Sequence, residues 1–261
     1  MTFHPGMPLV IELALFALAV VVLSIGIVGK GHRIAGWVTL GGLVAIFGLT
    51  FLATEGASIL RGSFVQDGLA LFAKRLFIGS AVLSVLGSLT LTYDAFTRRT
   101  AEYHFALVAS LLGMSVLASA REFVLLFVAF ELMSIPLFLL TGFLKRDEVA
   151  SEAALKFFLV GTVSSAVIVY GMSFVYGVTG STTLDAIPAA MIDGHPLMRL
   201  GMALLLAGLG FKIAAFPFHM WAPDTYEAAS TPFVAWLSVA PKAAGFIALI
   251  RLFVEGVGRR R

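Results

Sequence analysis

The sequence contains no cysteine and few charged residues. Without cysteine it can hold no disulfide, no thiolate zinc site, no covalently attached c-type haem and no cysteine-bound iron–sulfur cluster. Only 13% of the 261 residues are charged and 59% are hydrophobic, whereas soluble domains have about 25% charged residues. With a mean hydropathy of +0.99, the composition excludes a soluble protein, because one core of this size cannot bury so much apolar surface.

Signals for several other classes of protein are also missing. The formal net charge is only +3, and there is no basic stripe with interleaved aromatic residues, so nucleic-acid binding is not expected. The N-terminal stretch MTFHPGMPLVIEL has no lysine or arginine ahead of its apolar run, unlike a secretory signal peptide, so this run is predicted to remain as a membrane helix. The motifs HExxH and GxSxG do not occur, and the glycines of residues 208–212 lack the spacing of a phosphate-binding loop.

What the sequence does have is a series of long apolar runs. A membrane-spanning helix needs about 20 apolar residues, and no alternation typical of a membrane β-barrel is seen. We therefore predict an all-α polytopic membrane protein with about eight transmembrane helices. The expected spans are residues 8–28, 34–53, 76–95, 104–120, 123–142, 153–177, 198–216 and 232–254.

The segments between these runs are interpreted as follows. Residues 67–75 are predicted to be an amphipathic lead-in at the membrane interface, and residues 178–197 a loop outside the bilayer. The prolines Pro217 and Pro223 are predicted to break a helix at or just beyond membrane depth. Basic residues slightly favour an N-terminus on the outer side. The inner loops would then hold six basic residues, Lys30, Arg33, Arg98, Arg99, Lys145 and Arg146, and the outer loops five, Arg61, Lys74, Arg75, Arg121 and Arg199. The tail Arg259, Arg260 and Arg261 would lie outside, against the tendency of basic residues to stay inside.

Three ionisable residues lie deep within apolar runs: Glu131, Lys212 and Lys242. Counted from the start of each run, they lie about 12, 21 and 15 Å along a helix. Each buried charge costs about 2.5–3.5 kcal/mol on insertion scales, and such residues usually mark ion pathways. Each also has a proline nearby: Pro136, Pro217 and Pro241. Because proline frees a backbone carbonyl, the combination predicts a hydrated ion path with interrupted backbone.

Other charged residues allow two interpretations. Intramembrane charges can simply hold helices together, and Lys156 could pair with Glu152 and extend to the interface rather than belong to the path. His219 follows the predicted break and is a candidate for contact with the path. Glu12 is predicted to be interfacial. Asp224 and Glu227 are expected to cap or solvate their loop.

Three motifs resemble a known family. They are FELMSIPLFLLTGF, then EAALKFFLVGTVSSAVIVYGMSFVYGVTGSTTL, then GLGFKIAAFPFHMWAPDTYEAASTPFVAWLSVAPKAAGFIALIRLF. They are similar to the antiporter-like subunits of proton-translocating NADH:quinone oxidoreductase (complex I), in particular to the subunit N type. The resemblance implies that Glu131 pairs with Lys212, that Lys242 relays protons, and that Lys156 and His219 also belong to the proton path.

The resemblance also implies a domain organisation. Residues 1–100 would form three leading helices, and residues 101–261 would form a first five-helix antiporter-type repeat, helices four to eight, with a broken seventh helix. Family members usually carry a second repeat, which this sequence lacks. We therefore expect a truncated or split gene, with a separate chain as the candidate supplier of the missing repeat.

The implied function is a non-redox subunit of a translocase, in which a buried Glu/Lys path moves protons as quinone is reduced elsewhere. No cofactor would be bound on this chain, and NADH, flavin, iron–sulfur clusters and quinone would belong to partner subunits. The expected partners are the other membrane-arm subunits and the lipid of a bacterial plasma membrane. Two alternatives stay open: a stand-alone cation/proton antiporter of the related multisubunit type, and a structural remnant that only seals the membrane arm.

Overall fold

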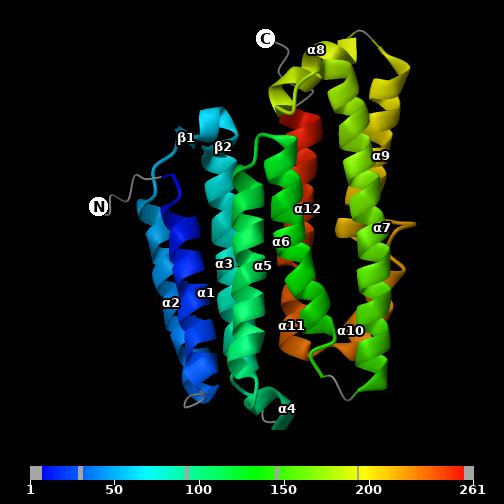
Figure 1. The fold of residues 1–261 in the computed structure, drawn as a ribbon. Helices are drawn as coiled ribbons and strands as arrows, with labels where there is room; N and C mark the ends of the chain where they lie inside the picture. Colours follow the sequence, from blue (N-terminus) through cyan, green and yellow to red (C-terminus); the bar gives the residue numbers. More distant parts are fainter. Residues whose placement is uncertain (1–7, 29–31, 92–93, 145–146, 193, 256–261) are drawn as a thin grey trace.

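A computed structural model describes residues 8–28, 32–91, 94–144, 147–192 and 194–255. Long helices stand side by side in one bundle, with α1 and α2 at one edge, α7 and α9 at the other, and α5 and α6 between them (Figure 1). The long helices are α1 (Val10–Val28), α2 (His32–Leu52), α3 (Gly68–Ser88), α5 (Thr100–Ser119), α6 (Phe123–Thr141), α7 (Glu148–Thr179) and α9 (Pro196–Lys212). The prediction of an all-helical membrane protein is confirmed, apart from one small β-hairpin.

Shorter elements connect and complete the bundle. The hairpin consists of β1 (Ala57–Ile59) and β2 (Phe64–Gln66), joined by the 3-10 turn η1 (Leu60–Gly62), and its strands pair antiparallel with Ser58 opposite Val65. The sequence did not predict this hairpin. The other short helices are α4 (Asp94–Thr97), η2 (Leu184–Ala186), α8 (Ile187–Ile192), α10 (Trp221–Ala228), α11 (Thr231–Leu237), α12 (Ala240–Leu249) and the π-helical η3 (Ile250–Glu255).

Seven helical segments of the described residues are long and apolar enough to cross a membrane. They are α1, residues Ile34–Leu52 of α2, α3, α5, α6, α7 and the composite segment Thr231–Val254. The predicted span 198–216 corresponds to α9, which has 17 residues and ends at Lys212. The total of eight crossings therefore stays a prediction. The residues Lys30, Lys145, Arg146 and Arg259–Arg261, which entered the prediction of orientation, lie outside the described residues.

The third predicted span was placed too late in the sequence. Helix α3 begins at Gly68, where the Asp67 side chain caps it by accepting a hydrogen bond from the Ala70 amide at 2.9 Å, and it ends at Ser88. The interfacial lead-in predicted for residues 67–75 is therefore wrong, since these residues form the cap and first turns of the long helix itself. Their charge misled the prediction because Lys74 is buried rather than placed at an interface.

Three connections meet at one end of the bundle, which we call the hairpin end. The β1–β2 hairpin contacts the short turn between α5 and α6 through the Arg121 amide, which donates to the Ser63 carbonyl at 2.8 Å. The same turn binds the segment after α7, because the Phe123 amide donates to the Thr182 carbonyl at 2.9 Å. Figure 1 shows the hairpin and α8 at the same end of the molecule. The α5–α6 turn at Arg121 and Glu122 was correctly predicted.

Helices α5 and α6 pack closely because α5 carries a glycine at their contact. A Cβ atom on Gly113 would lie 2.4 Å from the Met133 backbone nitrogen and 2.8 Å from the Leu132 carbonyl carbon. Such distances leave no room for any side chain. Next to this contact, the Ser110 hydroxyl donates to the Met133 carbonyl at 2.8 Å. This close packing fixes the position of α6, which carries Glu131 and Ser134.

Candidate proton-transfer site

Lys212 is a buried cation at the end of a helix. It is the last residue of α9, and 7% of it is exposed. Its ammonium donates a hydrogen bond to the Ser134 hydroxyl of α6 at 2.8 Å and lies 5.8 Å from the ring centre of Phe130. The carbonyl end of a helix and an aromatic face both attract a cation. The site therefore stabilises a positive charge without placing a carboxylate in direct contact with it.

The backbone leaves the helical conformation directly after Lys212. Ala214 has a positive φ of 54°, and helix α10 begins only at Trp221. The Trp221 indole donates to the Phe211 carbonyl at 3.2 Å and so binds the new helix to the end of α9. Pro217 lies in this non-helical segment, whereas Pro223 lies in the first turn of α10, where a missing N–H is tolerated. The predicted break at Pro223 is therefore wrong.

Glu131 is half-buried on α6 and is bound by a serine of the neighbouring helix. The Ser165 hydroxyl of α7 donates to its carboxylate at 2.6 Å. The ion pairs of the described residues do not include Glu131 with Lys212. Helix α6 also continues through Pro136 from Phe123 to Thr141. The expectation of an interrupted backbone beside all three charges is thus wrong at Glu131, because one missing helical hydrogen bond does not end this well-packed helix.

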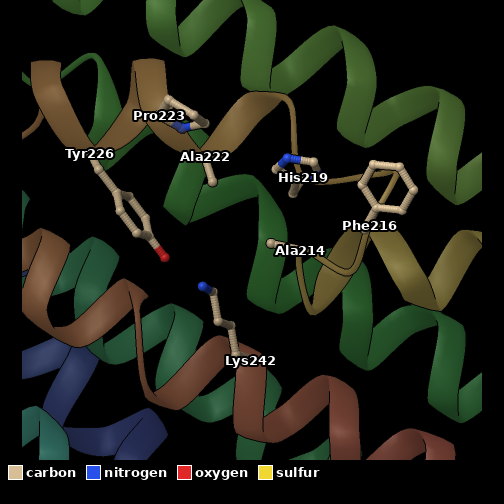
Figure 2. A pocket seen from close by; sticks show the side chains of 7 residues that line it. All are labelled: Ala214, Phe216, His219, Ala222, Pro223, Tyr226 and Lys242. Atoms are coloured by element: carbon tan, nitrogen blue, oxygen red, sulfur yellow. The ribbon is translucent and has the colours of Figure 1, made fainter.

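Lys242 lies beside the second change of backbone direction. Helix α11 ends at Leu237 and α12 begins at Ala240, with Pro241 in its first turn. The Lys242 side chain faces an open cavity of about 510 Å³, lined also by Ala214, Phe216, His219, Ala222, Pro223 and Tyr226. Figure 2 shows its ammonium directed toward the Tyr226 hydroxyl, with His219 across the cavity. The structure therefore brings Lys242 and His219 to one open cavity.

A much smaller cavity lies beside Lys212. Its volume of about 20 Å³ is enough for about one water molecule. Ser134 and Lys212 line it on one side, and Leu237 and Pro241 line it on another. Since Pro241 removes the helical donor of the Leu237 carbonyl, this cavity joins the buried ammonium to the start of the helix that carries Lys242.

Lys156 is placed differently from the other lysines. Its ammonium pairs with Glu152 at 2.8 Å and with Asp224 at 2.9 Å, and 48% of the Lys156 side chain is exposed. Asp224 was expected to cap or solvate its loop, but it binds this lysine and so connects α10 to α7. The pairing with Glu152 that the sequence suggested is present, together with a second carboxylate that it did not suggest.

A second buried charge pair was missed by the sequence analysis. The Lys74 ammonium of α3 lies 2.7 Å from the Glu12 carboxylate of α1, and their side chains are 0% and 6% exposed. The Ser115 hydroxyl of α5 donates to the same carboxylate at 2.6 Å. The prediction that Glu12 is interfacial is therefore wrong. The sequence did contain a signal for this pair, because Lys74 lies within the apolar run that forms α3. The predicted span began at residue 76 and therefore left Lys74 out.

The family model for "NADH:quinone oxidoreductase/Mrp antiporter, TM" matches residues 120–257, which include Glu131, Lys156, Lys212, His219 and Lys242. The chain belongs to this antiporter family. The resemblance to this family that the three motifs indicated is confirmed. The match covers more than half of the chain.

Relatives of this antiporter-family chain agree with the assignment. It is 40% identical over 252 residues to NADH-quinone oxidoreductase subunit N of Desulforamulus reducens, covering 95% of this chain and 53% of that protein. It is 37% identical over 256 residues to F(420)H(2) dehydrogenase subunit N of Methanosarcina mazei, covering 93% and 52%. Respiratory complex I from Thermus thermophilus contains a chain with a similar fold, with a TM-score of 0.76, 34% identity and coverage of 92% and 52%.

The antiporter-family chain spans about half the length of these relatives. Within the part of the chain that the structure describes, no group of three or more His, Asp or Glu side chains could hold a metal ion. The charged groups of the site are individual carboxylates and amines. Each contacts a serine hydroxyl, an aromatic ring or an oppositely charged side chain. Such groups can bind and release protons.

Proposed function

We propose that this chain is a membrane-arm subunit of an NADH:quinone oxidoreductase and carries part of its proton path. Membership of the family and similarity to subunit N proteins support this proposal. The observation that carries it is the position of Lys212, a buried ammonium at the end of α9. A cavity the size of about one water separates it from the helix of Lys242, which faces an open cavity.

The proposed path runs from Lys212 to Lys242 and is controlled by Glu131. A buried ammonium keeps its proton while a carboxylate is near and releases it more readily when that carboxylate moves away or is neutralised. Rotation of the Glu131 side chain away from Lys212 would ease proton loss from the Lys212 Nζ atom. The proton would then pass through water beside Leu237 and Pro241 to Lys242, and leave through the cavity that His219 lines. Lys156 would act at the edge of this path through Asp224.

The remaining assignments follow from the same proposal. Residues 1–100 would form the leading helices and residues 101–261 the first antiporter-type repeat. The chain itself would bind no redox cofactor, so that NADH, flavin, iron–sulfur clusters and quinone would be bound by partner subunits. Its partners would be other membrane-arm subunits in a bacterial plasma membrane.

The test is proton translocation by the assembled complex. Lys212→Met and Glu131→Gln should each lower the number of protons moved per quinone reduced, because each removes a charge of the path. Arg199→Gln is the matched control, since Arg199 is an exposed cation on the same helix α9 and its loss should leave translocation at the wild-type level. Wild-type translocation and quinone reduction in both path variants would refute the proposal and favour the structural-remnant alternative.

A second candidate is a cation/proton antiporter that works without redox partners. It is favoured by the family description, which covers both NADH:quinone oxidoreductases and Mrp antiporters. The two functions are separated by measuring cation-driven proton movement in vesicles that contain the complex but receive no electron donor. Exchange that depends on Lys212 under these conditions would favour the antiporter, whereas movement only during quinone reduction favours the oxidoreductase subunit.

A further inference from the structure

We propose that Glu12 and Lys74 form a second proton-exchange site, apart from Glu131 and Lys212, that takes up protons from the hairpin end. The inference rests on the proposed function, because it assigns this site to the same proton-moving subunit. Its members come from helices α1 and α3, which lie outside the residues matched by the family model. The two side chains are 6% and 0% exposed and their charged atoms lie 2.7 Å apart.

One oxygen of the Glu12 carboxylate has no hydrogen-bond partner among the described residues. Oε1 of Glu12 accepts from both Lys74 and Ser115, whereas Oε2 is buried and has no hydrogen-bond partner among the described residues. A buried ion pair that serves only structure needs its remaining lone pairs satisfied to offset desolvation. An unpartnered carboxylate oxygen is instead the atom at which a proton would bind. Lys74 beside it would keep the unloaded carboxylate ionised.

A line of polar groups leads from the pair to the hairpin end. The Lys74 ammonium contacts the Gln66 side-chain oxygen at 3.4 Å, and the Gln66 amide donates to the Thr54 carbonyl at 3.1 Å. Gln66 is 1% exposed, whereas Thr54 is exposed. In the opposite direction, the next three buried side chains of α3 after Lys74 are apolar, namely Phe77, Ile78 and Ala81, before the buried Ser84. Proton uptake is therefore expected from the hairpin end.

The charged groups that face the pair are also at this end. Lys74 interacts electrostatically with Asp67 and Arg251 besides Glu12. Asp67 in turn binds Arg251 at 2.6 Å and Arg121 at 2.7 Å. Besides Gln66, the Ser115 hydroxyl of α5 and the Phe64 ring of β2 contact the pair, and the centre of that ring lies 5.1 Å from the Lys74 ammonium. A single proton gained by Glu12 thus changes the net charge of a small, largely buried group.

The proposed step is a simple proton transfer. A hydronium ion at the hairpin end gives one proton to Oε2 of Glu12, so that one O–H bond forms, one breaks and water is left. The net charge of the Glu12–Lys74 pair rises from zero to plus one, and it returns to zero when Oε2 of Glu12 releases the proton. The site shares one feature with the Glu131 site, because a serine of a neighbouring helix donates to the carboxylate at 2.6 Å in both cases.

The deciding experiment removes both charges together in the assembled complex. Glu12→Gln alone leaves the buried Lys74 ammonium unpaired and would fail for structural reasons, but Glu12→Gln with Lys74→Met leaves no charge at the site. We expect this double variant to assemble and to move fewer protons per quinone reduced than the wild type. Arg75→Met, the loss of the neighbouring cation on α3, is the matched control and should leave the ratio unchanged. Wild-type translocation in the double variant would overturn the proposal, because a purely structural pair can be replaced by neutral side chains.

A second measurement does not depend on translocation. In Lys74→Met, Glu12 has lost its cation and should be protonated, which gives a carboxylic C=O infrared band that is absent from the double variant. In D₂O this band should shift as the proton exchanges, and Gln66→Leu should slow the shift. A band that stays unshifted while amides of the hairpin end exchange would overturn the proposed access. Translocation by Lys212→Met tests only the path of Glu131 and Lys212, whereas the double variant tests only the site of Glu12 and Lys74. Failure of one proposal can therefore be told from failure of the other.

Discussion

At the scale of single residues, the hydroxyl of Tyr226 is a polar group that faces Lys242 without a hydrogen bond. The Lys242 ammonium lies 5.2 Å from the centre of the Tyr226 ring, and the hydroxyl oxygen is buried and has no partner among the described residues (Figure 2). An ammonium above an aromatic ring gains about 0.5–1 kcal/mol or more from the ring itself. The ring would therefore hold the lysine, and the hydroxyl remains available to exchange protons with it through water.

Tyr226→Phe separates these two contributions. The ring and its packing remain, so we expect an unchanged thermal unfolding temperature but fewer protons moved per quinone reduced. Tyr176→Phe is the matched control, because Tyr176 is an exposed tyrosine on α7, and it should change neither quantity. Equal translocation by Tyr226→Phe and the wild type would mean that the hydroxyl has no part in the path.

The candidate residues could be found from the sequence only where a charge stood inside an uninterrupted apolar run. Glu131, Lys212 and Lys242 satisfied this criterion, and their roles stay predictions. Lys74 did not, because Lys74 and Arg75 together lower the local hydropathy enough to end a predicted span. The structure places Lys74 against Glu12, 62 positions earlier in the chain. A hydropathy profile cannot represent such compensation between distant residues, so it mistakes a buried pair for an interfacial segment.

At the scale of helices, the contact of α5 with α6 depends on Gly113. An alanine there would place its Cβ atom 2.4 Å from the Met133 nitrogen, which is a backbone atom that cannot rotate away. Overpacking of this kind costs about 1–3 kcal/mol. We expect Gly113→Ala to lower the thermal unfolding temperature of the purified protein, because the two helices must move apart.

Gly41→Ala provides the comparison for this prediction. Gly41 lies within α2, and an added Cβ atom would meet nothing within 4 Å. Alanine is favoured over glycine inside a helix by about 1 kcal/mol. Gly41→Ala should therefore leave the unfolding temperature unchanged or raise it slightly. Similar losses of stability in both variants would show that the close approach of α5 and α6 is not what requires the glycine.

Most of the long helices could be predicted because each is a long apolar run bounded by charges or turn residues. The ends of several of them could not, and two of these have a clear structural cause. Helix α3 starts earlier than predicted because Asp67 caps it and Lys74 is paired. Helix α9 stops at Lys212, although the apolar run continues to residue 216, because the backbone turns there and α10 packs back through Trp221. The hairpin was missed because strands of three residues leave too little periodicity to detect.

At the scale of the whole molecule, Asp67 connects the start of α3 to the distant segment η3. Its carboxylate accepts hydrogen bonds from Arg251 at 2.6 and 2.7 Å, although the two residues are 184 positions apart. Arg251 also donates to the Ala118 carbonyl of α5, at 2.7 Å. Arg121 adds a third contact to Asp67 from the turn between α5 and α6. One acidic side chain thus joins α3, the end of α5 and η3 at the hairpin end.

Removal of this negative charge should destabilise the entire bundle. Asp67→Asn keeps a side chain that can cap α3, but it takes away the carboxylate that faces two guanidinium groups, one of them fully buried. Breaking a buried pair from one side costs about 3–5 kcal/mol. We expect a clearly lower unfolding temperature than for Glu55→Gln, an exposed carboxylate before the hairpin. A loss no larger than that of Glu55→Gln would mean that Asp67 does not join these segments.

The stabilisation by Asp67 should persist into acid. Burial raises the pKa of this carboxyl, but the hydrogen bonds from Arg251, Ala70 and Arg121 and the charge of Arg251 outweigh burial and hold the pKa well below its usual range. A depressed folded-state pKa contributes stability that is complete above the unfolded value of about 3.9 and is lost only as pH falls through the folded value. The difference in unfolding temperature between wild type and Asp67→Asn should therefore stay constant from neutral pH to about pH 4. It should shrink only in stronger acid. A difference that already disappears between neutral pH and mild acid would show that the arginines do not hold Asp67 in its ionised form.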